Sequence, residues 1–340
     1  MKAARLHAFG ESLRIDSVEV PKVARDEVLL RIVGAGVCHT DLHIREGKFP
    51  PIWPFPFALG HENAGIVEAI GPDVTRFRPG DRVVVWGAHG CGNCRICHEG
   101  DEPPCGMEYW LGNGGYAEFM HIPSQRLLVP LNGINPVEAA PLADAGITPY
   151  RAIKKALPHL YPGASVVIVG VGGLGHMALQ ILRALAPWVQ ILAVDVADDK
   201  LEMALKYGAH HAIDARRDAA SEIKRLTGGE GARAVIDLVG SDTSLSTAAA
   251  AAGRKSILVL VGLAGGSLPF SFFAMRAESI VTTSYWGSYT DLEEVLELAR
   301  TGGIRAQIET FPLDQVDDVL NQLEQGKIKG RAVITPMSPT

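Results

Sequence analysis

The stretch Ser165-Val166-Val167-Ile168-Val169-Gly170-Val171-Gly172-Gly173-Leu174-Gly175 decides the fold. Four of its first five residues are β-branched and apolar, as is typical of a strand buried on both faces. The mostly apolar run 176–185 that follows indicates a helix. Between them, Gly170, Gly172 and Gly175 form a Gly-x-Gly-x-x-Gly turn, which lets the backbone approach a pyrophosphate at the positive end of the helix. The stretch therefore predicts a dinucleotide-binding turn.

A second apolar strand, 189–194, ends in Asp195, twenty residues after Gly175. A carboxylate at this distance can accept hydrogen bonds from both hydroxyls of an adenosine ribose. The alternative is that Asp195 caps the next helix. The order of strand, glycines, helix, strand and acid favours a ribose-binding role for Asp195.

The alternation of strands and helical stretches continues from residue 146 onward and predicts an α/β domain with a doubly wound parallel sheet. Residues 1–145 lack this rhythm and contain short alternating runs, such as 27–33 and 65–70, which predict a β-rich domain. The tail is too short for its own core and is expected to return to the first domain. The six strands expected in the sheet are 165–169, 189–194, 211–213, 234–238, 257–261 and 280–284; the tail is expected to hold helices at 291–301 and 314–325 and a strand at 331–334.

Composition bounds the class of protein. The chain has 340 residues, 47% of them apolar, which suits two domains with ample cores. A net charge of −6 without a Lys/Arg block argues against nucleic acid or a membrane surface as partner and favours a small molecule. The segment 256–275 is uncharged over twenty residues and so raises the question of a membrane span, but Gly265 and Pro269 favour a buried strand with a loop. With no secretory signal near Met1 and clustered cysteines, the expected compartment is the cytoplasm.

The first of two constellations that carry chemistry is Cys91-x-x-Cys94-x-x-Cys97-x7-Cys105. Four thiolates so closely spaced can surround one zinc tetrahedrally and leave no position for water, so the site is expected to be structural. An iron–sulfur cluster, whose spacing differs in detail, and redox cysteines are the alternatives.

The second constellation is Cys38-His39-Thr40-Asp41-Leu42-His43 together with Gly60-His61-Glu62. A thiolate and a neutral imidazole leave positions for a further ligand and for an exchangeable water or substrate, which is the open arrangement of a catalytic zinc. A lone histidine is more often a core residue. Cys38, His61 and a nearby carboxylate together outweigh that alternative.

With these motifs, the chain resembles the zinc-dependent medium-chain alcohol dehydrogenases from Met1 to about Thr335, and most closely bacterial NAD-dependent secondary-alcohol dehydrogenases. The resemblance implies a GroES-like catalytic domain at 1–145 and 285–340, with a zinc lobe near 88–108, and a Rossmann domain at 146–284. It implies that Cys38 and His61 bind the catalytic zinc and that Asp41 orients His61. The usual third cysteine is replaced by Asp144, and Glu62 is a transient or alternative ligand.

The resemblance also assigns the proton relay and the cofactor contacts. Thr40 receives the substrate proton, and His43 is the outlet of this relay, through the nicotinamide ribose. The residues that would contact NAD are His39, Thr148, Gly170, Gly172, Gly173, Leu174, Gly175, Asp195, Lys200, Val261, Gly262 and Arg331. The aromatic residues expected in the substrate pocket, each of which could instead lie in the core, are Trp53, Trp110, Tyr285 and Trp286.

The predicted function is reversible oxidation of an alcohol by NAD, with two zinc ions per subunit. The expected substrate is a secondary alcohol with a bulky or aryl substituent. One alternative is a polyol dehydrogenase of the same superfamily; another is a zinc protein that senses NAD without turnover. Family members of this length are often tetramers, so a homo-oligomer is expected.

Overall fold

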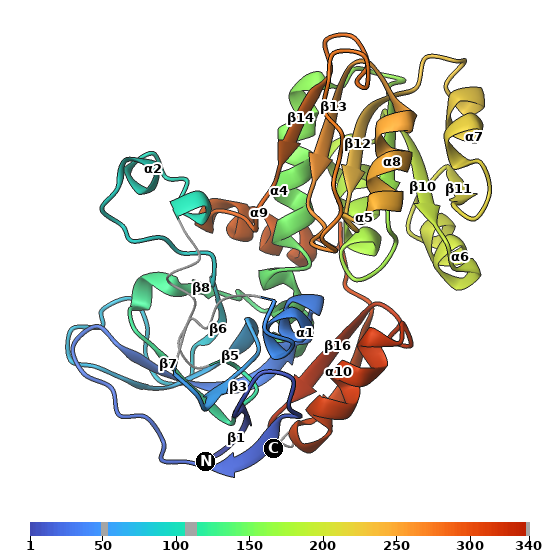
Figure 1. Ribbon diagram of the computed structural model, residues 1–340. Coiled ribbons are helices and arrows are strands. Elements are labelled where there is room, and N and C mark those ends of the chain that lie inside the picture. Colours follow the sequence, from blue (N-terminus) through green and yellow to red (C-terminus); the bar gives the residue numbers. More distant parts are fainter. Residues whose placement is uncertain (49–53, 106–113, 338–340) are drawn as a thin grey trace. The chain divides into compact units, whose positions relative to one another are not determined.

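The computed structural model of the protein describes residues 1–48, 54–105 and 114–337 (Figure 1). The chain forms two compact units. Unit 1 consists of Met1–Asp144, Gly287–Thr301 and Ala306–Thr340, and unit 2 consists of Ala145–Trp286 and Gly302–Arg305.

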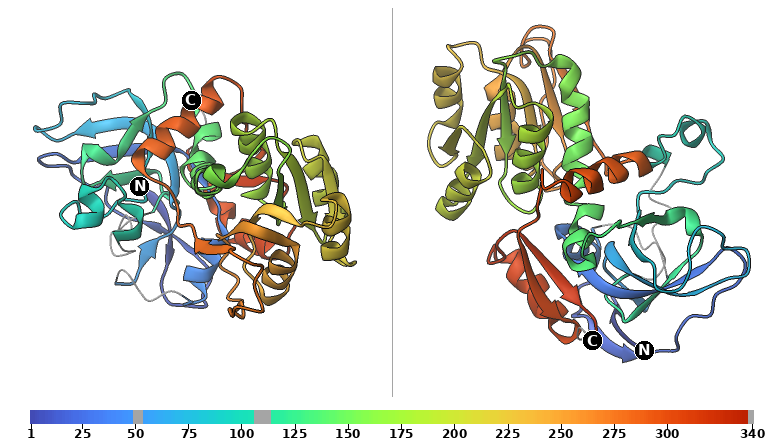
Figure 2. Two further views of the ribbon diagram at one scale, coloured as in Figure 1. Left: turned by 90° about the horizontal axis from the view of Figure 1, so that it is seen from above. Right: turned by 180° about the vertical axis from the view of Figure 1, so that it is seen from behind.

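Unit 2 is built on a six-stranded sheet in which every pair of neighbouring strands is parallel, in the order β11-β10-β9-β12-β13-β14. Helices lie on both sides of this sheet (Figures 1 and 2), which confirms the predicted doubly wound α/β fold. Val167, Leu192 and Val235 are fully buried in its core. The strands are β9 (Ser165–Val169), β10 (Gln190–Asp195), β11 (His211–Asp214), β12 (Ala232–Asp237), β13 (Ala252–Leu260) and β14 (Ile280–Thr283), and the helices are α4 (Ile147–Ala156), α5 (Gly175–Leu185), α6 (Asp198–Lys206), α7 (Ala219–Leu226) and α8 (Asp242–Ala251), with the 3-10 turn η5 (Leu157–His159) after α4.

Strand β13 is longer than the sequence predicts. It begins at Ala252, five residues before the predicted start at Ile257. The exposed, charged residues Arg254 and Lys255 interrupt the apolar pattern, and the register against β12 shifts between Ala232 and Ala234. The early half of the strand therefore has no apolar signature, although the segment 256–275 forms the expected strand and loop.

Unit 1 is mostly β-structure. Its larger sheet contains β15 (Ile308–Pro312), β16 (Arg331–Thr335), β3 (Val28–Gly36), β5 (Glu62–Ile70), β6 (Arg82–Val85) and β8 (Leu128–Pro130) in that order, with β7 (Phe119–Ile122) paired to β3. Its smaller sheet contains β2 (Arg14–Ser17), β1 (Lys2–Leu6) and β4 (Phe57–Ala58). The helical segments of the unit are α1 (His39–Arg45), α2 (Arg95–His98), η1 (Pro103–Cys105), η3 (Gln125–Leu127), α3 (Pro136–Ala139), η4 (Ala140–Ala143), α9 (Tyr289–Arg300), η6 (Leu313–Gln315) and α10 (Val316–Glu324).

The tail of the chain completes the larger sheet of unit 1, as expected. Strand β16 pairs with β3 in antiparallel fashion, with Val333 opposite Gly36 and Ile334 opposite Ala35. The helix expected from Asp314 begins at Val316, because residues 313–315 form the 3-10 turn η6 instead. Among the described residues, no helix is long and apolar enough to span a membrane.

Candidate metal centres and cofactor edge

The pairing of β3 with β5 brings the first two candidate ligands together. Gly36 at the end of β3 lies opposite Glu62 at the start of β5. Cys38 follows Gly36 by two residues and caps helix α1, and His61 directly precedes Glu62, so both side chains lie at the same end of the strand pair. Asp144 reaches this point from the end of the buried 3-10 turn η4.

The three donor atoms converge. Asp144 Oδ2 lies 3.4 Å from Cys38 Sγ and 3.6 Å from His61 Nε2. Two donors bound to one zinc at ~2.0–2.3 Å and at the tetrahedral angle are about 3.3–3.8 Å apart. The spacings therefore fit ligands of a common zinc, in a set that leaves a coordination position open to substrate. The predicted grouping of Cys38, His61 and Asp144 is seen in the structure.

Glu62 also belongs to this cluster, because one of its carboxylate oxygens lies within 4.8 Å of a donor atom of each of the other three residues. Its carboxylate is fully buried and forms an ion pair with Arg331, itself only 3% exposed. A side chain at Gly36 would collide with this carboxylate. Glu62 therefore has a cationic partner within unit 1, and the guanidinium of Arg331 is engaged by the carboxylate of Glu62.

Asp41 holds the ligand residues Cys38 and His61 in position through hydrogen bonds. Its carboxylate is fully buried and accepts hydrogen bonds from the backbone N–H groups of Cys38 (3.0 Å) and Gly60 (3.2 Å). Its Oδ1 lies 3.3 Å from His61 Nδ1. A carboxylate on Nδ1 fixes the tautomer and the orientation of the ring, so that Nε2 is free to bind a metal.

Tyr116 adds a fourth hydrogen bond to Asp41, which the sequence analysis missed. Its hydroxyl donates to Asp41 Oδ2 at 2.8 Å. Burial, together with the charge of Asp41, raises the pKa of Tyr116 well above its usual range, so the hydroxyl stays protonated and donates. The ring packs against Gly60, whose φ of 96° and lack of side chain leave room for it. The only sequence signal was the preceding Gly114-Gly115 pair.

Thr40 and His43 lie one turn apart on helix α1, so they share a face of that helix. Thr40 Oγ1 is 3.6 Å from Cys38 Sγ. Burial chiefly, and then the positive charge of Lys48, lowers the pKa of His43, while Glu46 opposes this shift. The imidazole of His43 is therefore neutral at pH 7 and able to accept a proton.

The four-cysteine lobe forms a second centre. Its Sγ–Sγ distances are 3.5 Å for Cys94–Cys97, 3.6 Å for Cys94–Cys105 and 3.9 Å for Cys91–Cys97. These spacings also match a tetrahedral zinc, here with four thiolates and no open position. Backbone N–H groups of Asn93 and Cys91 point at Cys91 Sγ and Cys105 Sγ respectively, as is favourable for thiolates.

The base of this lobe is fixed by one ion pair. Arg126 pairs with Glu102 at 3.0 Å and donates to the carbonyl oxygen of Gly90 at 3.1 Å. Glu102 in turn accepts from the N–H of Gly90 at 2.7 Å. The loop that carries the cysteines is thus attached to the turn η3.

In unit 2 the predicted cofactor residues lie along one edge of the sheet. Val169 at the end of β9 is level with Val194 in β10 and with Asp237 in β12, and Asp237 is level with Leu260 in β13. The residues that follow the carboxyl ends of these strands therefore gather at this edge. They include Gly170, Val261 and Gly262, and Asp195 is itself the last residue of β10.

The glycine turn fits a pyrophosphate. Gly170 has a φ of 91°, and a side chain on Gly175 would collide with the carbonyl oxygen of Gly170. A side chain on Gly172 would meet nothing within 4 Å, so the space above this residue is free for a ligand. Gly173 and Leu174 complete the turn into α5, whose first residues offer backbone N–H groups.

Asp195, the predicted ribose ligand, also accepts hydrogen bonds from the protein backbone. Its carboxylate accepts hydrogen bonds from the backbone N–H of Val171 (2.7 Å), Val196 (2.7 Å) and Ala197 (3.1 Å). These contacts tie the glycine turn to the loop before α6, and they agree in part with the capping alternative. A carboxylate has about four acceptor positions, so a ribose hydroxyl can still be accommodated.

The remaining predicted residues are placed as follows. Thr148 is buried in the first turn of α4, and Lys200 is half-buried in α6. Tyr285 and Trp286 contact each other edge to face with ring centres 6.2 Å apart, and Trp286 is only 6% exposed. The predicted pocket residues Trp53 and Trp110 lie outside the described residues. His39 is exposed at the start of α1.

Comparisons with known proteins agree with this geometry. Residues 24–133 match the family model described as alcohol dehydrogenase GroES-like domain, and residues 173–301 match the model described as zinc-binding dehydrogenase. The chain is 38% identical to a D-arabinose 1-dehydrogenase (NADP(+)) of Saccharolobus solfataricus, over 98% of this chain and 97% of the relative.

Two solved structures are similar over nearly the whole chain. An alcohol dehydrogenase from Aeropyrum pernix has a TM-score of 0.92 and 41% identity, covering 99% of this chain and 100% of the other. An acetophenone reductase from Geotrichum candidum, in complex with NAD, has a TM-score of 0.86 and 30% identity, covering 98% and 96%. These matches confirm the family resemblance predicted from the motifs.

Proposed function

The chain belongs to the zinc-binding alcohol dehydrogenase family, and from this premise we propose that it catalyses reversible hydride transfer between an alcohol and NAD, with one zinc in each cysteine-containing site. The observation that carries the proposal is the convergence of Cys38 Sγ, His61 Nε2 and Asp144 Oδ2, which leaves one position open. A zinc there supplies a Lewis acid that lowers the pKa of the substrate hydroxyl.

The chain's own residues position this chemistry and conduct the proton. Asp41 holds His61 with Nε2 toward the other ligands. The hydroxyl of Thr40, beside Cys38 Sγ, accepts the proton of the substrate and passes its own onward. The neutral imidazole of His43, one turn further along the same helix face, receives that proton and releases it to water.

The proposed cofactor is NAD rather than NADP. The 2′-phosphate of NADP would meet the carboxylate of Asp195, and the next residues, Val196 and Ala197, offer no cation to neutralise it. Like charges placed together cost several kcal/mol. We expect kcat/KM with NAD to exceed that with NADP by about a hundredfold or more. Equal kcat/KM values with the two cofactors would refute the assignment.

The proposed substrate is a secondary alcohol with a bulky or aryl substituent. The likeness to an acetophenone reductase supports this class, because reduction of that ketone gives an aryl secondary alcohol. The second candidate is a polyol or sugar, which is favoured by the relative named D-arabinose 1-dehydrogenase. Turnover of 1-phenylethanol, sorbitol and D-arabinose, each followed by NADH absorbance, separates the two candidates.

The same assay tests the proposed function as a whole. A zinc-loaded protein that reduces ketones or aldehydes with NADH supports it. A protein that binds NADH but consumes it with no carbonyl compound would instead be a sensor without turnover. Zinc analysis should give two ions per subunit, one for each cluster of donors.

The proposed working form is a homo-oligomer, a tetramer by likeness to the family, in the cytoplasm. All five cysteines are free thiols, and they all lie in the two candidate zinc sites, which suits a reducing compartment. Light scattering on the purified protein measures the subunit number. A monomer at micromolar concentration would contradict the proposed assembly.

A further inference from the structure

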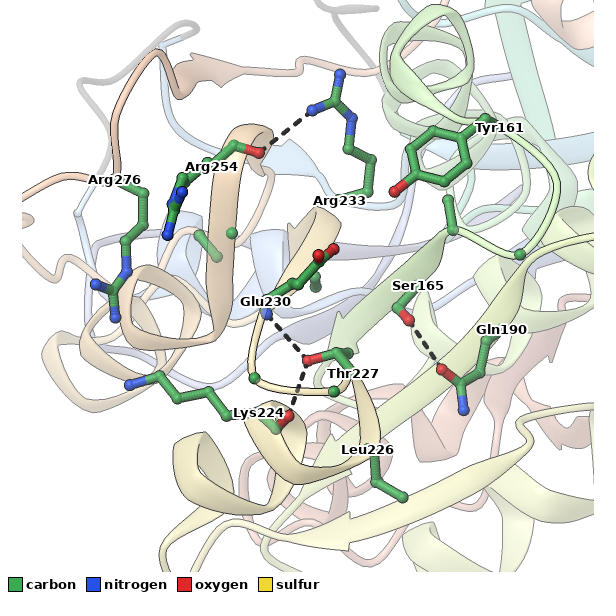
Figure 3. Close-up of a pocket in the computed structure, with 18 residues that line it drawn as sticks. Tyr161, Ser165, Gln190, Lys224, Leu226, Thr227, Glu230, Arg233, Arg254 and Arg276 are labelled. Carbon is green, nitrogen blue, oxygen red and sulfur yellow. Dashed lines mark hydrogen bonds between the residues drawn. The ribbon is translucent and has the colours of Figure 1, made fainter.

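Unit 2 contains a cavity of about 780 Å³ at the edge of the sheet where its parallel strands begin (Figure 3). Four strands contribute their first residues to its walls: Ser165, Gln190, Ala232 and Ala252. The glycine turn and Asp195 lie at the opposite, carboxyl ends of the strands. The cavity is therefore separate from the cofactor edge, and both can be occupied at once.

The walls of this cavity are strongly basic. They carry the side chains of four cations and one acid; these are Lys224, Arg233, Arg254, Arg276 and Glu230. The chain as a whole has a net charge of −6, so this concentration of positive charge runs against its overall balance. An excess of one sign inside a cavity raises the local concentration of ligands with the opposite charge.

None of the four cations has a carboxylate partner within 4.0 Å in the part of the chain that the structure describes. Among the described residues, Lys224, Arg254 and Arg276 form no ion pair within 4.0 Å, and Glu230 forms none either. Figure 3 shows these three cations gathered along one side of the cavity. Their mutual repulsion is relieved when an anion binds between them, and this relief adds to the free energy of binding.

The fourth cation is held in place. Arg233 Nε donates to the carbonyl oxygen of His159 at 2.8 Å, and Nη1 donates to that of Arg254 at 3.3 Å. Its guanidinium lies 6.0 Å from the centre of the Tyr161 ring, which is 52% exposed. Because two backbone carbonyls fix this guanidinium, a ligand that binds it loses little side-chain entropy on the protein's side.

We propose that this cavity binds a small polyanion that carries at least two phosphate groups, independently of the cofactor edge. The volume is within the range of about 300–1,000 Å³ that small-molecule sites occupy. One phosphate can contact Lys224, Arg254 and Arg276 while another contacts Arg233. The exposed ring of Tyr161 offers a face for an organic part, so both an inorganic polyphosphate and an organic bisphosphate have the required chemistry.

The test is calorimetric titration of the intact protein, with and without saturating NADH. The two probes are inorganic tripolyphosphate and fructose 1,6-bisphosphate, and the tighter of the two identifies the source of the phosphates. We expect saturable binding that NADH does not abolish and that added NaCl weakens. The double variant Arg254→Ala/Arg276→Ala should bind at least about tenfold more weakly, because it removes two cations that donate charge-assisted hydrogen bonds to the anion.

A matched control removes the same charge from unit 2 outside the cavity. The double variant Lys206→Ala/Arg225→Ala changes two exposed cations that do not line it. Affinity within twofold of the wild type in this control, together with the loss in the first variant, supports the site. Equal losses in both variants would show attraction to general positive charge, and absence of saturable binding to the wild type would overturn the proposal outright. Unchanged NADH affinity in both variants verifies that unit 2 remains folded.

Discussion

The two candidate metal centres of unit 1 are constructed in different ways. The four-cysteine lobe takes all its donors from Cys91 to Cys105, and these cysteines are half-buried, apart from the buried Cys97. The other centre combines Cys38 with His61 and with Asp144, which is 106 residues from Cys38 in the chain. Its supporting carboxylate, Asp41, is fully buried.

This difference distinguishes a structural site, which stabilises a loop, from a catalytic site. Four thiolates saturate one zinc, so its binding energy goes into ordering the loop that carries them. Three donors supplied by the ends of packed elements leave a position open, and their geometry depends on the surrounding fold. Removing a donor from each centre should therefore have different consequences.

The largest effect is expected from Asp144→Ala. Loss of one anionic donor weakens metal binding, so the variant should keep one zinc of two, and turnover should fall by about a thousandfold or more. Metal analysis and NADH absorbance measure these two quantities. Asp199→Ala, at an exposed carboxylate of α6, is the control and should change neither.

Two further variants define the role of Asp144. Asp144→Cys restores the charge but lengthens the bond to zinc from ~2.0–2.2 Å to ~2.3 Å, so we expect zinc to return without full activity. If Asp144→Ala kept both zinc ions while Glu62→Ala lost one, Glu62 would be the third ligand. Asp144 would then merely end the turn η4.

The second largest effect is expected from Cys94→Ser in the four-cysteine lobe, and it is a loss of stability. A weakened zinc site should lower the melting temperature by on the order of 10 °C, while turnover per folded molecule remains near that of the wild type. Asn93→Ser, at the exposed neighbouring residue, serves as the control. A variant with an unchanged melting temperature and no turnover would assign this lobe to the chemistry instead.

A smaller effect is expected from Tyr116→Phe, which keeps the ring under Gly60 but removes the hydroxyl that donates to Asp41. Loss of such a supporting hydrogen bond weakens metal binding by about 10–100-fold. Competition with a chelator should show this loss at one zinc per subunit only. Tyr289→Phe, which removes a hydroxyl bonded to the carbonyl oxygen of Leu128, should leave both affinities unchanged. Equal weakening at both centres would mean that Tyr116 only stabilises the fold.

The smallest effect concerns the proton outlet, His43→Ala. Burial chiefly lowers the pKa of His43 below its ordinary value of 6.5, so the wild type keeps a neutral imidazole as the pH falls toward that value and loses it only below its lowered pKa. The variant should therefore be slowed most on the acid side of neutrality, by about tenfold, with partial rescue by imidazole buffer. His98→Ala, at the exposed end of α2, should keep the wild-type profile. An unchanged profile in His43→Ala would exclude it from the relay.

The features that neighbouring residues determine could be predicted from the sequence. The six strands, the glycine turn and the cysteine spacing are carried by neighbouring residues, and the structure confirms the fold they predict. Asp144 could be proposed only through the family resemblance, because nothing near it in the chain marks a ligand. Tyr116 was missed because its partner Asp41 lies 75 residues away, and single-sequence patterns do not report such contacts.

The order of the two units in the sequence also affects how the chain can fold while it is being translated. Unit 2 is almost entirely encoded between the two main parts of unit 1, so a ribosome can release it for folding while unit 1 is still incomplete. Strand β3, which leads to Cys38, has β5 along one side; on its other side β7 pairs with residues 28–31, and β16, the last strand in the sequence, pairs with Ala35 and Gly36. The end of β3 nearest Cys38 therefore has an unpaired edge until residues 331–335 have been translated, and during that interval it can pair with another nascent chain.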